Sequence, residues 1–200
     1  MQGVFVRELG APPLNLSEIL RYAGMRGTPD DGLSALLDSC LAEVAHGLCY
    51  RVCFLEHGVK MTDTGVDFGY MQVDSADLAR CLSGCDRALT FVATVGPLPD
   101  RMIARYGRVA PTKALLHQAI GAERIEALCD AFLDLLRAEQ GISLCPRFSP
   151  GYGDLSLTVQ GDIFRALNPA RLIGVSTTDS LLMVPSKSVT AIVGIKKEQV

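Results

Sequence analysis

The sequence predicts an α+β fold in which helices and strands follow one another in irregular order. Three observations lead to this prediction. In residues 48–55 the side chains alternate with the period of a strand. Residues 89–95 form a short, nearly continuous apolar run, which is typical of a central strand buried on both faces. Residues 111–140 repeat apolar side chains at helical spacing and form the longest predicted element.

The length and composition are those of one globular domain. The chain has 200 residues, of which 48% are hydrophobic, and this is enough for a substantial core. We expect a single domain over residues 1–200, with N-terminal helices and strands in 1–110 and a second part in 111–200. No apolar run reaches the roughly 18 residues that a membrane span requires. The N-terminus lacks the basic and apolar regions of a signal peptide, so we expect a cytoplasmic protein.

Charge and cysteine content argue against two classes of function. The formal net charge is −3 and no basic run occurs, so nucleic-acid binding is not expected. The seven cysteines are an odd number, and neither the pair Cys49 and Cys53 nor the pair Cys81 and Cys85 has Cys-x-x-Cys spacing. With only three scattered histidines, we expect no metal site, and mostly buried, reduced thiols.

Caps, turns and apolar periodicity predict the remaining elements. Those of the first half are a strand at 4–6, a helix at 18–22 capped by Ser17, a helix ending at Val44 and capped by Thr28, a turn at 57–58, a strand at 59–61, a helix at 76–82 capped by Asp74, and a helix at 100–106. Those of the second half are a helix from Pro111 to about Gln140, a helix at 157–167 ended by Asn168-Pro169, strands at 172–175, 181–184 and 189–195, and a charged tail at 196–200.

The stretch Cys145-Pro146-Arg147-Phe148-Ser149-Pro150-Gly151-Tyr152-Gly153-Asp154 follows the long helix. Its prolines favour extended backbone, and its glycines allow a sharp corner and the close approach of a ligand. An arginine on such a stiff loop suits a small anionic or zwitterionic ligand, because a guanidinium can bind a carboxylate through two parallel hydrogen bonds. The alternative is ordinary turn chemistry with a surface ion pair, which is usually worth less than about 1 kcal/mol.

Residues Arg147 to Tyr152 resemble the Arg-x-x-Pro-Gly-Tyr signature of the activation domain of cobalamin-dependent methionine synthase. Residues 178–189 resemble the closing hairpin of that family, with Asp179 in place of a glutamate and Val184 in place of a tryptophan. The resemblance covers roughly residues 112–195. It implies a mixed, mostly antiparallel twisted sheet packed against a long helix and several shorter helices.

The resemblance also implies that the chain binds S-adenosylmethionine. Arg147 would hold the methionyl carboxylate, backbone groups from Ser149 to Gly151 would read the adenosine or the amine, and Tyr152 would pack on the ligand or stabilise the loop. Asp134 on the long helix is the best match for the acid that meets the α-amino group, with Glu126 next, although either could be ordinary helix surface. The expected binding residues are Arg147, Phe148, Ser149, Pro150, Gly151, Tyr152 and Asp134, with no catalytic residue and no metal ligand.

The implied role is the reductive methylation of cobalamin in a partner protein. The sequence has no Asp-x-His-x-x-Gly motif of the cobalamin-binding modules, so a corrinoid-binding protein or a truncated methionine synthase would carry the cobalamin, with a flavodoxin-type protein as electron donor. We therefore expect a component of methionine synthase (methyltransferase) activity that acts in trans, rather than a self-sufficient enzyme.

Two alternatives remain open. Tyrosines that contact the ligand in the family lie beyond its closing hairpin and have no counterpart in this sequence, so the chain could be a non-catalytic docking subunit of a corrinoid system that binds little or no ligand. An unrelated methyltransferase fold is weaker, because no strand is followed by the Gly-x-Gly loop that such a fold uses.

Overall fold

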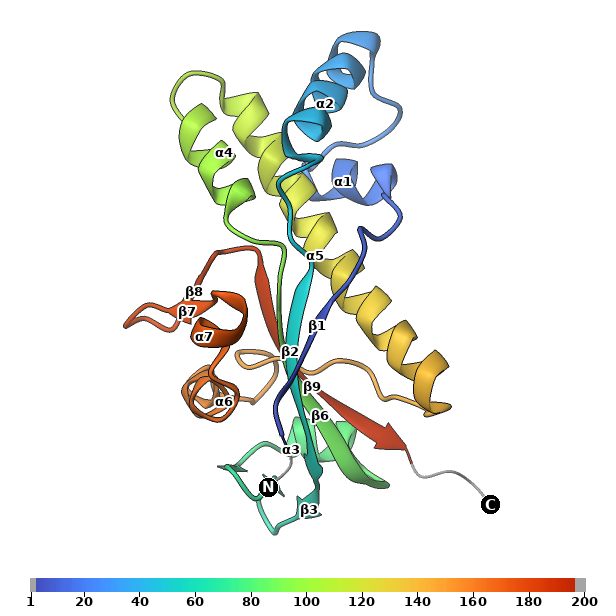
Figure 1. Ribbon diagram of the computed structural model, residues 1–200, viewed down its shortest axis with the longest axis vertical. Coiled ribbons are helices and arrows are strands. Elements are labelled where there is room, and N and C mark those ends of the chain that lie inside the picture. The colour runs from blue at the N-terminus through green and yellow to red at the C-terminus, as the bar shows by residue number, and fades with distance from the viewer. Residues whose placement is uncertain (1–2, 197–200) are drawn as a thin grey trace.

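A four-stranded antiparallel sheet forms the centre of the molecule (Figure 1). The structure is a computed structural model and describes residues 3–196. Both neighbours of β6 are antiparallel to it, and Phe91 of β6 pairs with Phe54 on one side and with Ala191 on the other. The strands, in their spatial order, are β1 (Phe5–Glu8), β2 (Arg51–Gly58), β6 (Cys85–Thr94) and β9 (Ser188–Lys196).

Seven helices and two small sheets complete the described part of the chain. The helices are α1 (Leu16–Tyr22), α2 (Asp31–Val44), α3 (Ala76–Cys81), α4 (Leu98–Tyr106), α5 (Pro111–Gln140), α6 (Val159–Leu167) and α7 (Pro169–Ile173). The small sheets are β3 (Lys60–Met61), β4 (Val66–Asp67) and β5 (Gln72–Val73), and β7 (Ser176–Thr177) with β8 (Met183–Val184). This architecture confirms the predicted α+β class, with its mostly antiparallel sheet and long helix.

Helix α5 packs across one face of the sheet with its C-terminal half. It ends at Gly141, which adopts the left-handed conformation (φ 68°) that glycine tolerates best. The ring of Phe132 lies 5.2 Å from the ring of Phe54 and 5.3 Å from that of Phe91. Because Phe132 is fully buried, this contact stabilises the docking of helix on sheet by about 1.5–3 kcal/mol.

Helices α6 and α7 and the strands β3 to β5 lie against the other face of the sheet. Along β6 the side chains alternate, so that Phe91 and Ala93 face α5 while Ala88 and Val92 face α6 and α7. Strand β6 is thus central and buried on both faces, as the apolar run at 89–95 predicted.

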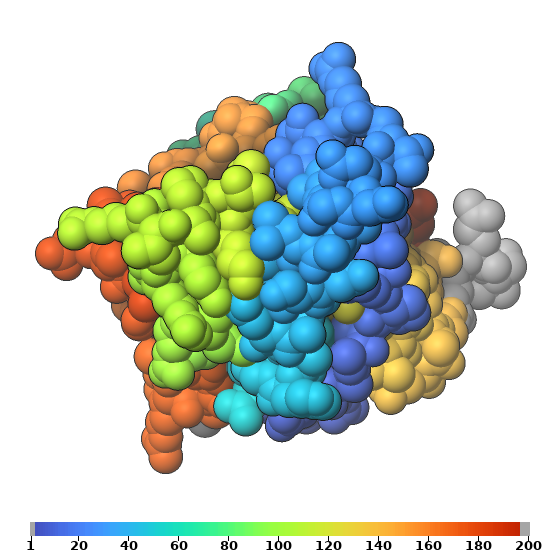
Figure 2. Space-filling view, turned by 90° about the horizontal axis from the view of Figure 1, so that it is seen from above, coloured from blue at the N-terminus to red at the C-terminus, as the bar shows by residue number. Residues whose placement is uncertain are grey.

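The N-terminal half of α5 leaves the sheet and packs against α1, α2 and α4. Figure 2 shows this end from above, with α2 and α4 side by side. One carboxylate joins the helices: Glu43 of α2 accepts hydrogen bonds from Tyr106 of α4 (3.0 Å) and from Lys113 of α5 (2.8 Å). The helical end is therefore tied together by a polar contact as well as by its apolar core.

The structure corrects several predicted helix caps. The side chain that accepts a hydrogen bond from the first turn belongs to Asn15 rather than Ser17 in α1 and to Asp30 rather than Thr28 in α2. In α3 it belongs to Ser75, the residue after the predicted Asp74. All of these residue types cap helices well, so the helix start depends on where the apolar face meets the core.

The strand predicted at 172–175 is wrong, because these residues lie mostly in and just after helix α7. Asn168 ends α6 in the left-handed conformation, and Pro169, with its φ already suited to a helix, begins α7 at once. The predicted strand at 181–184 is reduced to Met183–Val184, since Leu181 has a positive φ of 62°. The turn predicted at 57–58 is also wrong, because β2 continues to Gly58 by pairing with β6.

Residues 197–200 of the predicted charged tail lie outside the described residues, whereas Lys196 ends β9. All seven cysteines are free thiols, and five of them are buried. Within residues 3–196 no helix is both long enough and apolar enough to cross a bilayer.

Candidate functional site

The segment that carries Arg147 runs beside the free edge of β9. The backbone N–H of Cys145 donates to the carbonyl of Gly194 at 2.9 Å. Phe148 and Ile192 exchange two backbone hydrogen bonds, at 2.9 and 2.8 Å. These bonds hold the segment against the sheet as an irregular fifth strand, so the position of Arg147 is defined by the sheet rather than by a mobile loop.

The far end of the loop is attached to α3. The carboxylate of Asp154 accepts hydrogen bonds from the backbone N–H groups of Ala76 (2.8 Å) and Asp77 (3.3 Å) and from the hydroxyl of Ser75. The bond from Ser75 is the main reason why the pKa of Asp154 lies below its ordinary value. Gly153 has a φ of 55°, and a Cβ there would lie 2.6 Å from the carboxylate of Asp77, so this corner requires glycine.

Arg147 points from the loop to helix α5. Its Nη2 donates to Glu126 at 2.9 Å and to Asp130 at 3.0 Å. The arginine side chain is only 23% exposed, whereas the side chains of Glu126 and Asp130 are 42% and 68% exposed. The site therefore holds a half-buried guanidinium next to two carboxylates that reach solvent.

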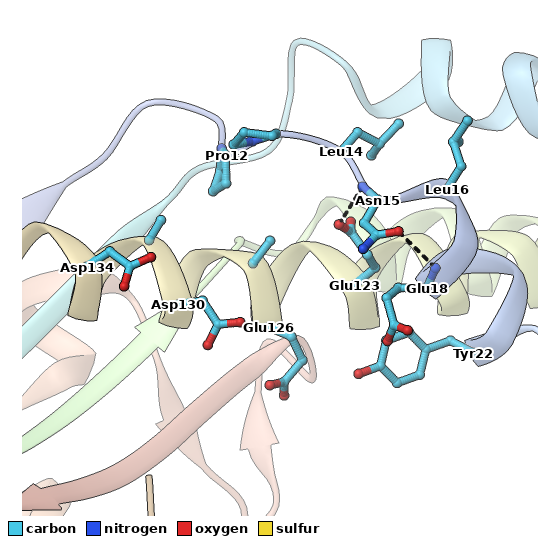
Figure 3. A pocket seen from close by; sticks show the side chains of 13 residues that line it. Pro12, Leu14, Asn15, Leu16, Glu18, Tyr22, Glu123, Glu126, Asp130 and Asp134 are labelled. Atoms are coloured by element: carbon cyan, nitrogen blue, oxygen red, sulfur yellow. Dashed lines mark hydrogen bonds between the residues drawn. The ribbon is translucent and has the colours of Figure 1, made fainter. Parts of the chain in front are cut away.

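Two adjoining hollows meet at these carboxylates. The first has a volume of about 720 Å³ and lies between α5 and the segment 12–16 that leads into α1 (Figure 3). The second, of about 490 Å³, lies between α5 and the loop and includes Arg147 and Ser149. Glu126 and Asp130 line both. Volumes of this size suit a small organic ligand.

An acidic row follows one face of α5. Glu126, Asp130 and Asp134 are spaced four residues apart, which places them on the same side of a helix, and Figure 3 shows all three along the first hollow. The structure brings Glu126 and Asp130 to Arg147, whereas Asp134 pairs with Arg137 at 2.6 Å and is 72% exposed. Asp130 was missed in the sequence, although its place midway between Glu126 and Asp134, four residues from each, could have indicated it.

The other predicted residues take different places. Ser149 lines the second hollow, while Phe148, Pro150, Gly151 and Tyr152 line neither. Phe148 packs against the core between the sheet and α6, and its ring meets the ring of Tyr152 edge-on at 5.9 Å. Tyr152 is 72% exposed. The N–H of Gly151 already donates to the carbonyl of Leu155 at 2.8 Å, so it stabilises the turn.

The arrangement is chemically complementary to a zwitterion. Arg147 offers a charged donor for a carboxylate, and Glu126 and Asp130 offer acceptors for an ammonium group a few ångströms away. Among the described residues, no group of three or more His, Cys, Asp or Glu side chains is arranged to hold a metal ion. The chemistry that this site favours is recognition of an amino-acid head group.

Comparison with known proteins supports the fold. No protein-family model and no curated protein matches the sequence. Among solved structures, a crystal structure of the MetH reactivation domain bound to AdoHcy matches with a TM-score of 0.71 and 14% identity, over 100% of this chain and 80% of that chain. The chain shares its fold with the MetH reactivation domain. At 14% identity the likeness shows the fold alone. Any statement about function must therefore be argued from the residues of the site.

Proposed function

We propose that this chain is an activation-domain-like protein that binds S-adenosylmethionine and supports the reductive methylation of cobalamin held by a partner. One observation carries the proposal: on a reactivation-domain fold, the guanidinium of Arg147 and the carboxylates of Glu126 and Asp130 meet where two ligand-sized hollows adjoin. The same arginine was singled out by the Arg-x-x-Pro-Gly-Tyr sequence.

The charges of the ligand suit the site. S-adenosylmethionine carries a carboxylate, an ammonium group and a sulfonium, so it is both a zwitterion and a net cation. Arg147 would bind the carboxylate, while Glu126 or Asp130 would accept from the ammonium. The acidic row along the first hollow favours the additional positive charge of the sulfonium.

The present ion pairs can be exchanged for contacts with the ligand. Because Glu126 and Asp130 are partly exposed, their pairs with Arg147 are individually weak and can rearrange. A ligand that brings one carboxylate and one ammonium group replaces a protein ion pair by two ligand ion pairs. The guanidinium meanwhile stays oriented by the backbone pairing of the loop with β9.

The contribution of this chain to the reaction is positional. The ligand supplies the methyl group, and the cobalamin of a corrinoid-binding protein or truncated methionine synthase, reduced by a flavodoxin-type donor, would accept it. The residues at the hollows hold the sulfonium at a defined place on the surface, and positioning of this kind can account for a large part of a rate enhancement.

The second candidate is a docking subunit that binds little or no ligand. The observation in its favour is that Arg147 already contacts two carboxylates, so the guanidinium has charge partners without a ligand. The two candidates differ in one measurable property, the affinity for S-adenosylmethionine.

Isothermal titration calorimetry with S-adenosylmethionine separates them. We expect the wild type to bind and Arg147→Ala to bind roughly 10- to 100-fold more weakly, since a hydrogen bond to a charged group contributes about 1.5–3 kcal/mol. Arg165→Ala is the matched control, because Arg165 forms an exposed ion pair with Asp162 on α6, away from both hollows. A wild type without affinity would favour the docking subunit, and equal affinity of Arg147→Ala would remove Arg147 from the site.

A further inference from the structure

A buried ion pair joins α5 to the segment before α1. Glu123 and Arg124 are neighbours on α5, and their side chains are 4% and 5% exposed. Two guanidinium nitrogens of Arg124 lie 2.5 Å from the carboxylate of Glu123. The guanidinium also donates to the carbonyls of Pro12 (2.7 Å) and Pro13 (2.8 Å). We call Glu123 and Arg124 the clamp.

The clamp supplies hydrogen bonds that the segment 12–16 cannot obtain from a strand or helix. Prolines have no N–H group, so Pro12 and Pro13 cannot take part fully in a ladder. Their carbonyls instead accept from Arg124, and the backbone N–H of Asn15 donates to Glu123 at 3.0 Å. Two charges buried in this way are tolerated only when nearly every polar atom is paired, and these contacts provide the pairing.

The clamped segment forms one wall of the first hollow. Figure 3 shows Pro12, Leu14 and Leu16 along the side opposite the acidic row, with Tyr22 near one end. This wall is mainly apolar, whereas the region near Arg147 is charged. The hollows therefore offer two chemically different ends, one for an amino-acid head group and one for a flat, largely apolar ring such as a purine.

We propose that Glu123 and Arg124 are positioning residues that set the purine-binding end of the site by holding the wall 12–16 against α5. This inference rests on the proposed function, because it assigns the adenosine half of S-adenosylmethionine to the first hollow. Arg124 lines neither hollow, and the Glu123 carboxylate, which lines the first, is already paired with Arg124 and with the N–H of Asn15. The clamp therefore acts indirectly. It determines the width of the hollow through the backbone of the two prolines and Asn15.

The test compares two ligands that differ in their head group. 5′-Methylthioadenosine keeps the adenosine and the sulfur of S-adenosylmethionine but lacks the amino acid. Calorimetry would measure both ligands on the wild type, Arg124→Lys, the double variant Glu123→Gln/Arg124→Met, and Arg147→Ala. The double variant removes both charges at similar volume, so that no unpaired charge is left in the interior, and Arg124→Lys keeps the charge but loses the planar fork.

We expect the double variant to bind both ligands roughly tenfold or more weakly, and Arg124→Lys to lie between it and the wild type. Arg147→Ala should lose affinity for S-adenosylmethionine by roughly tenfold or more but change 5′-methylthioadenosine by less than about twofold. A merely structural clamp would lower stability but leave the affinity of the folded clamp variants for 5′-methylthioadenosine unchanged. Hydrogen exchange of residues 14–22 should be faster in the double variant, and it reports on the wall even if binding is weak.

Each outcome decides the question. If the wild type binds S-adenosylmethionine but the clamp variants bind 5′-methylthioadenosine as tightly as the wild type does, the inference is wrong and the proposed function stands. If the wild type binds neither ligand, both the inference about the clamp and the proposed function are wrong. If the double variant does not fold, Arg124→Lys carries the comparison alone, and unchanged affinity for both ligands in that variant contradicts the inference.

Discussion

Protonation of His57 should destabilise the protein in mild acid. The ring lies inside the molecule, 4% exposed, with Nε2 2.8 Å from the hydroxyl of Thr90 and Nδ1 3.2 Å from the carbonyl of Gly58. The rings of Phe68 and Tyr70 meet it edge-on at 4.9 and 5.1 Å. Burial in these surroundings lowers the pKa of His57 from 6.5 to about 4.

The sign and size of the effect follow from this pKa. As the pH falls below 6.5, the unfolded chain binds a proton at His57 that the folded chain does not bind until about pH 4. The free energy of unfolding therefore has its full value, as far as His57 is concerned, above about pH 6.5. It falls progressively as the pH drops from 6.5 to about 4. Because one pKa unit corresponds to about 1.4 kcal/mol, the total loss is about 3 kcal/mol.

Urea denaturation of the wild type and of His57→Gln, at several pH values from about 7.5 to about 4, measures this loss. Glutamine cannot titrate but can still reach Thr90. The other titrating groups, including His117, whose pKa is also lowered by burial, are common to both proteins and cancel in the difference. We expect the free energy of unfolding of the wild type to fall by about 3 kcal/mol more than that of the variant. If the free energies of unfolding of the two proteins fall equally as the pH is lowered, the reasoning is refuted.

Two further predictions concern glycine and the loop. Gly121→Ala should lower the free energy of unfolding by about 1–3 kcal/mol, because the new Cβ would lie 2.9 Å from Cγ of Lys187. Gly161→Ala on α6, with open space around the new Cβ, should instead raise it by about 0.5–1 kcal/mol, and thermal or urea denaturation of the pair would show opposite signs. Asp154→Ala should lower the urea midpoint and weaken S-adenosylmethionine binding in calorimetry, because the loop loses its attachment to α3. Unchanged binding would show that this attachment is not needed to position the residues that bind the ligand.

Local sequence was sufficient to predict where an element begins and ends when a single residue strongly favours that end. Pro111 and Gly141 bound α5 as expected, since proline suits a first turn and glycine a left-handed end. It was not sufficient where several capping residues stand close together, as Asn15 and Ser17 do. It also failed at 172–175, where β-branched and apolar residues suggested a strand, but Pro169 began a helix that buries Ile173.

The candidate site was only partly predictable because it is assembled from distant segments. Arg147 was found from its loop, but its partner Asp130 depends on how that loop lies on α5. The wall at 12–16 is more than 100 positions from the residues that hold it, with 112 positions between Pro12 and Arg124. No local pattern predicts a contact of this kind, and only the folded chain shows it.

Each face of helix α5 makes a different kind of contact. One side enters the core with Phe132, another holds the buried pair at 123–124, and a third carries the acidic row. Inserting or deleting one residue between 124 and 130 would turn the remainder of the helix by about 100°, so that Phe132 would lose its contacts with Phe54 and Phe91, and Asp130 would turn away from Arg147. We therefore expect homologous chains to vary in length in the connections before and after this helix, and to keep its register unbroken throughout.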